Sequence, residues 1–133
     1  MLLHHRSVLV YILLAAGAAQ ASQAQTVPAG NPAGASSVAD TNGDVIQAGR
    51  KVFHGPGGCY ACHGGKLQGG PVAPPLTGPK FKGIDGSFEA ILHVVRGGVP
   101  GTAMVAHPGG IDDGQTIQVA NYVYAVIHGQ TKP

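Results

Sequence analysis

Apolar residues recur three and four positions apart in three segments of the chain, over residues 44–54, 87–96 and 112–128. This spacing puts them on one face of a helix. They are Val45, Ala48, Val52 and Phe53, then Phe88, Ile91, Leu92 and Val95, and finally Ile117, Ala120, Val123, Tyr124 and Ile127. Residues 64–86 and 97–110 hold too many Gly and Pro for long regular structure, and no strand pair is indicated. The pattern predicts an all-α fold with three main helices and long Gly/Pro-rich loops.

Capping residues mark where these helices begin. Asp44 is suited to cap the first helix, with Gln47 three positions on as its capping-box partner. Ser87 opens the second helix, and Asp112 or Asp113 opens the third. Glycines follow each segment, as they commonly do at the carboxyl ends of helices.

The N-terminal segment has the features of an export signal. Arg6 gives a short positive start, and Val8 to Ala19 is an uncharged run. Small residues at alternate positions then allow cleavage after Ala21 or Ala24. The apolar run is shorter than the roughly 20 residues that span a bilayer, which argues against an uncleaved anchor. We therefore expect residues 1–24 to be a cleaved signal peptide, and the mature protein to lie in the periplasm without stable membrane insertion.

Composition divides the remaining chain into a leader and one domain. Residues 25–41 are rich in Pro, Gly, Ala and Ser, which predicts a flexible leader before a folded domain at 42–133. That domain is poor in core material, because the chain has no Trp and only three Phe. Its only two Cys are three residues apart, so a bridge between them would stabilise little. We expect another group to complete the core. The net charge of +2 without a basic cluster does not indicate a nucleic-acid partner.

The sequence Cys59-Tyr60-Ala61-Cys62-His63 carries the candidate chemistry. In a helical turn, residues three and four apart share a face, so Cys59, Cys62 and His63 can point at one flat object. This is the attachment pattern of haem c, with two thioethers and a proximal imidazole on the iron. A thioredoxin-like thiol pair expects a βαβ setting, and a structural zinc site needs two more ligands. The other candidate histidines are scattered, at His54, His93, His107 and His128.

With this motif, residues 44–129 resemble a small mono-haem bacterial class I c-type cytochrome. The resemblance includes a Gly-x-x-x-aromatic pattern before the haem motif, here Gly49 to Phe53. It implies that the first and last helices cross at this glycine, with Val119 and Tyr122 packed against it. Residues 42–133 would then form a cytochrome c domain around one covalently bound haem c.

The resemblance also implies two further site residues. The segment Pro74-Pro75-Leu76-Thr77-Gly78 matches the family's Pro-x-Leu-x-Gly, in which the first carbonyl accepts the second ring N–H of the proximal histidine. Pro74 would then orient His63. Met104, in a loop of small residues, matches the distal thioether ligand, which raises the reduction potential. Val105 stands where the family commonly has Pro. The competing ligands are His107 and, more distantly, His93 and His54.

A haem with both axial positions filled has no place for a substrate, so the expected function is one-electron transfer rather than catalysis. The partners expected are redox proteins: a membrane complex and a terminal reductase or oxidase for a free shuttle, or a periplasmic dehydrogenase for a bound subunit. A docking face of Val72, Ala73, Val105 and Ala106 is expected to give weak salt dependence. The alternative is a haem enzyme or sensor, for peroxide reduction or gas binding, with an open or labile sixth position. A haem-free thiol oxidoreductase is a third hypothesis.

Overall fold

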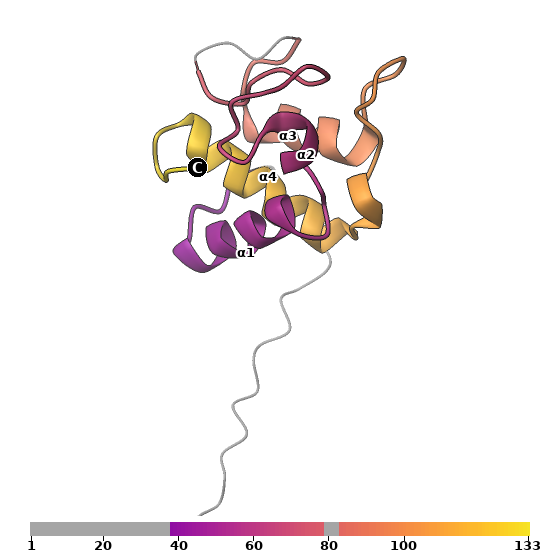
Figure 1. Ribbon diagram of the computed structural model, residues 1–133. Helices are drawn as coiled ribbons and strands as arrows, with labels where there is room; N and C mark the ends of the chain where they lie inside the picture. The colour runs from indigo at the N-terminus through magenta and orange to yellow at the C-terminus, as the bar shows by residue number, and fades with distance from the viewer. Residues whose placement is uncertain (1–37, 79–82) are drawn as a thin grey trace, which may run out of the picture. The chain divides into compact units, whose positions relative to one another are not determined.

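The computed structural model describes residues 38–78 and 83–133 of the chain (Figure 1). The predicted signal peptide, 1–24, and most of the predicted leader lie outside the described residues, and these boundaries stay predictions. Within the described ranges, no helix combines the length and the apolar character needed to cross a membrane.

The described residues form helices and loops without a strand. The helices are α1 (Gly43–His54), α2 (Tyr60–His63), α3 (Phe88–Gly97) and α4 (Asp113–Ile127), with a short 3₁₀ helix, η1 (Pro108–Gly110), before α4. The prediction of an all-α fold with three main helices and long loops is confirmed. The 3₁₀ helix was not expected, because its glycines indicate only a turn.

Two of the three predicted helix caps are present. Ser87 caps α3, and Asp112 forms a full capping box with Gln115, whose backbone N–H lies 2.7 Å from the Asp112 carboxylate. The predicted cap of α1 was wrong: Asn42 caps this helix, and its side chain accepts the N–H of Asp44 at 3.0 Å. Asn and Asp cap helices about equally well, so the pattern does not choose between them. Asp44 instead lies in the first turn, where its charge favours the helix dipole.

Helices α1 and α4 pack against each other (Figure 1). They cross at Gly49, as the resemblance implies. A Cβ at Gly49 would fall inside van der Waals distance of the Gln118 carbonyl and 2.7 Å from Cβ of Tyr122. The Tyr122 ring is fully buried and meets Phe53 edge to face, with ring centroids 5.6 Å apart. Val119 is also buried at this crossing. The glycine therefore lets the two backbones approach closely.

Helix α3 packs on the same helix α4 and closes the core. Its buried side chains are those of the predicted apolar face: Phe88, Ile91, Leu92 and Val95. Ahead of α1, the Asp40 N–H donates to the buried Asn121 side chain at 2.7 Å. Helix α4 is thus the central element, and the segments that carry the candidate site are arranged around it.

Candidate cofactor site

A cavity of about 710 Å³ lies against α2, α3, α4 and the loop before η1. Small-molecule sites in proteins commonly fall between roughly 300 and 1,000 Å³. The lining is mainly apolar and includes Phe53, Leu76, Ile84, Ile91, Val94, Val95, Val119 and Val123. All five predicted site residues line it as well: Cys59, Cys62, His63, Pro74 and Met104. The structure therefore brings the candidate residues together around one mainly apolar space.

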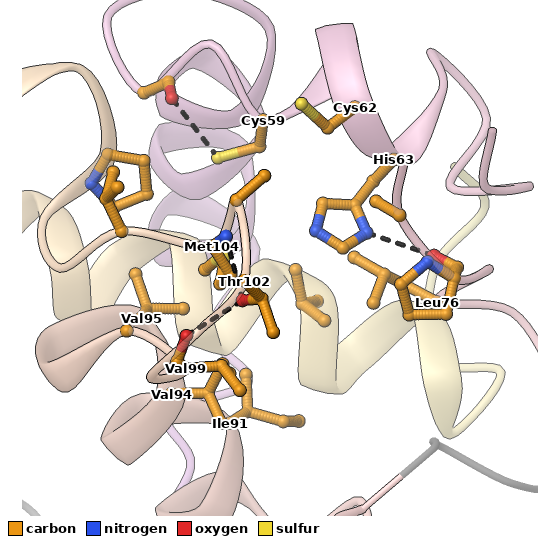
Figure 2. Close-up of a pocket in the computed structure, with 18 of the residues that line it drawn as sticks. Cys59, Cys62, His63, Leu76, Ile91, Val94, Val95, Val99, Thr102 and Met104 are labelled. Atoms are coloured by element: carbon orange, nitrogen blue, oxygen red, sulfur yellow. Dashed lines mark hydrogen bonds between the residues drawn. The ribbon is translucent and has the colours of Figure 1, made fainter. Parts of the chain in front are cut away.

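The first three come from one helical turn. The loop after α1 turns back, with the Gly57 N–H donating to the Val52 carbonyl at 2.9 Å. Cys59 then starts α2, and its carbonyl accepts the His63 N–H at 2.9 Å. This bond fixes the helical spacing that sets Cys59, Cys62 and His63 toward the cavity. Figure 2 shows both thiols and the imidazole bordering the same space.

His63 is held in one ring orientation. Its Nδ1 lies 3.0 Å from the carbonyl oxygen of Pro74, the contact that the resemblance implies. A carbonyl only accepts, so in the neutral ring Nδ1 carries the proton and Nε2 has the lone pair. Nε2 is therefore the ring atom able to bind a metal. The segment that carries Pro74 is itself fixed, because the Leu76 N–H donates to the Leu67 carbonyl at 2.7 Å.

Met104 enters the cavity from a loop that is hydrogen-bonded to itself. The Val99 N–H donates to the Met104 carbonyl at 2.8 Å, and the Thr102 hydroxyl donates to the Val99 carbonyl at 2.8 Å. The same hydroxyl accepts the Met104 N–H at 3.1 Å. Gly98 has φ +70°, and a Cβ there would lie 2.7 Å from the Met104 carbonyl. This position requires glycine, and the loop presents Met104 beside the space that His63 borders (Figure 2).

The other candidate ligands are placed differently. His107, His54 and His128 do not line the cavity; His107 contacts Thr116, and His54 stacks on Tyr60. His93 does line it, from the exposed side of α3. No group of three or more His, Cys, Asp or Glu suited to a metal occurs in residues 38–78 and 83–133.

The surroundings of Cys59 do not favour a reactive thiol. Burial raises the pKa of Cys59 from 9.0 to about 11, although a backbone hydrogen bond acts in the opposite direction. Its thiol also donates to the Gly57 carbonyl, with 3.6 Å between sulfur and oxygen. Thiol oxidoreductases need a lowered pKa for their attacking cysteine. A thiol kept protonated in an apolar wall is a poor nucleophile at neutral pH.

Exposed apolar side chains form the mouth of the cavity. Val72 and Val105, 66% and 59% exposed, and the smaller Ala73 line it as expected, whereas Ala106 does not. No Asp, Glu, Lys or Arg occurs in the described part of the lining. Sequence reasoning missed the wall that α3 contributes, although the spacing of Ile91 and Val95 marked that face as buried.

No protein-family model and no curated protein matches the chain. Several solved structures do. Cytochrome cL from Methylophaga aminisulfidivorans is 19% identical with a TM-score of 0.57, over 65% of this chain and 59% of that one. A chain of a reducing HAO-like protein complex from Kuenenia stuttgartiensis is 24% identical with a TM-score of 0.56, over 66% of this chain and 46% of that one. Cytochrome cL from Hyphomicrobium denitrificans is 17% identical with a TM-score of 0.51, over 62% and 47%.

These similarities establish the fold, which is that of c-type cytochromes. The chain spans between 46% and 59% of the length of these three structures. The cytochrome c fold and a Cys-x-x-Cys-His turn on the cavity wall together make this cavity the candidate site for a covalently bound haem c.

Proposed function

We propose that this protein transfers single electrons in the periplasm through one haem c, held by thioethers to Cys59 and Cys62 with His63 and Met104 as axial ligands. One observation carries the proposal: both thiols, the imidazole and the thioether line the same apolar cavity. When bound, haem c supplies reversible one-electron chemistry at its iron. The donor set fits, since two sulfurs, one lone-pair nitrogen and one soft thioether are what the group requires.

The chain's own residues set the properties of this site. The bond from Nδ1 of His63 to Pro74 keeps the imidazole in one tautomer and makes Nε2 a stronger donor. The soft sulfur of Met104 favours the reduced state of the iron. Apolar side chains of α3 and α4 form much of the cavity wall. If His63 and Met104 both hold the iron, the group would have no open position for a substrate, as expected of a carrier rather than an enzyme.

A redox protein is the proposed partner. The apolar mouth formed by Val72, Val99 and Val105 would meet it, since these side chains are exposed beside the cavity. The proposal covers a free shuttle and a subunit of a periplasmic oxidoreductase. One of the similar structures is a chain of a protein complex, which is compatible with the second form. Purification from the native periplasm distinguishes the two, because a subunit elutes with its larger partner.

The test starts with the full chain produced in a host that attaches haem in the periplasm. We expect the mature protein to gain the mass of one haem and to give the pyridine haemochrome spectrum of two thioethers. Ferric protein should show the red charge-transfer band of methionine ligation, and ferrous protein should bind carbon monoxide poorly. The bare polypeptide mass with two alkylatable thiols would refute the cofactor.

Met104→Ala should remove the charge-transfer band and admit carbon monoxide, whereas Val105→Ala, the neighbouring control, should do neither. A high-spin spectrum and rapid carbon monoxide binding in the unsubstituted protein would favour the enzyme or sensor hypothesis instead.

A further inference from the structure

His107 lies three residues after Met104 and does not itself line the cavity, whereas its neighbour Pro108 does. Its backbone is left-handed, with φ +44°. Among the non-glycine residues of the described ranges, only Leu67 also has a positive φ. Such a conformation persists in a residue with a Cβ when its surroundings determine it. Here the His107 N–H donates to the Val95 carbonyl of α3 at 3.0 Å. The chain direction after Met104 is thereby fixed.

The imidazole of His107 ties this point to α4. Its Nδ1 lies 3.0 Å from the hydroxyl of Thr116, a fully buried residue in the first part of that helix. Its Nε2 lies 4.0 Å from the Asp113 carboxylate, whose Oδ1 accepts from Arg96 of α3 at 3.2 Å. His107 thus links the loop to both neighbouring helices, to α3 through its backbone N–H and to α4 through its ring.

The residues after His107 reach the other ligand-bearing segment. Gly109 lies directly against Pro56, whose carbonyl carbon would be 3.2 Å from a Cβ at that position. Pro56 belongs to the turn that leads into Cys59 and α2. We call the bonds of His107 to Val95 and Thr116 the His107 clamp. This clamp lies between the segment that presents Met104 and the segment that presents the Cys-x-x-Cys-His turn.

We propose that His107 is a positioning residue for Met104, acting through its hydrogen bond to Thr116. This inference rests on the proposed function, in which Met104 binds the iron. The first arm of the loop is tied by the bonds among Val99, Thr102 and Met104. The second arm, Val105 and Ala106, is held by His107 at its far end. Loss of the clamp lets this arm move, and Met104 then competes less well against an external ligand.

The experiment measures imidazole binding to the ferric holoprotein, because imidazole must displace the distal ligand. Thr116→Val removes the hydroxyl at constant volume, and His107→Gly removes the ring while suiting the left-handed backbone. A net hydrogen bond contributes about 1 kcal/mol, which corresponds to roughly five- to tenfold in affinity. We expect each variant to bind imidazole about five- to tenfold more tightly, and the double variant to bind no more tightly than either one.

Thr116→Ser keeps the hydroxyl, so its imidazole affinity should stay within about twofold of that of the unsubstituted protein. The same is expected of the control His128→Ala. Unchanged imidazole affinity in Thr116→Val and His107→Gly, even with a lower denaturation midpoint, would overturn the positioning role. If Met104→Ala binds imidazole no better than the unsubstituted protein, Met104 is not the iron ligand. That result would overturn the ligand assignment in the proposed function, and with it the role of His107. If Thr116→Val does not fold, His107→Gly alone decides, because its side chain is only half-buried.

Discussion

Gly49→Ala tests whether the crossing of α1 and α4 controls the stability of the protein. The added Cβ would collide with the Gln118 carbonyl and come within 2.7 Å of Cβ of Tyr122. Both are parts of helix α4 that cannot rotate away, so the two helices must separate. That movement also loosens the edge-to-face contact between Phe53 and Tyr122.

The size of the effect follows from two opposing contributions. Ala favours a helix interior over Gly by about 1 kcal/mol. Overpacking a tight contact costs about 1–3 kcal/mol and more where backbone must move. Because the obstacle here is a backbone carbonyl, we expect a net loss of about 2 kcal/mol. For a domain of this size, that loss lowers the melting temperature by roughly 8–16 °C.

Thermal unfolding of the holoprotein, followed by far-ultraviolet circular dichroism, provides the measurement. Gly43→Ala is the matched control, since it lies in the same helix and a Cβ there meets nothing within 4 Å. It should melt at the same temperature as the unsubstituted protein or slightly higher. A Gly49→Ala protein as stable as this control would show that the crossing tolerates a methyl group and that the packing argument is wrong.

Three further predictions concern a buried hydroxyl, a buried thiol and the cavity mouth. Tyr122→Phe removes a buried hydroxyl that has no hydrogen-bond partner among the described residues, so urea denaturation should show a gain of about 1 kcal/mol; a loss of that size would contradict this. In haem-free protein that keeps its helical circular dichroism, the raised pKa of Cys59 favours the folded state below pH 9. This contribution is lost as pH rises toward about 11, and Cys59→Ala should remove that dependence from the denaturation midpoint. The rate of electron transfer with a redox partner should change less than about threefold between low and high ionic strength, because no charged residue lines the described mouth. A steep fall measured by stopped flow would refute an apolar docking face.

The helices were predictable because their signals are local. Apolar spacing and caps identified α3 and α4 within a residue of their observed starts. The predicted cap of α1, Asp44, was wrong, because Asn42 suits the cap position equally well and its side chain accepts the Asp44 N–H. The crossing at Gly49 needed the resemblance, since no local pattern reports which distant helix a glycine faces.

The same difference between local and distant signals applies to the residues of the candidate site. Cys59, Cys62 and His63 share one helical turn, so their spacing alone indicates that they act together. Pro74 and Met104 lie 11 and 41 residues beyond His63, and only the resemblance linked them to it. The contact between His107 and Thr116 depends on a left-handed residue and on the placement of α4. The spacing of residues in the sequence encodes neither feature. The sequence therefore offered His107 as a competing iron ligand, whereas its ring contacts Thr116 in the structure.

The side chains that join the helices also form the wall of the cavity. Phe53, Ile91, Val95, Val119 and Val123 are at most 8% exposed, and all five line the 710 Å³ space. Protein interiors pack at the density of organic crystals, and a core this small does not by itself fill such a volume. An apolar group in the cavity therefore contacts the atoms that hold α1, α3 and α4 together. A group that binds only the folded chain stabilises that state by its binding free energy. Retention of the cofactor and stability of the helix crossing are thus linked, and a substitution at Val119 should weaken both.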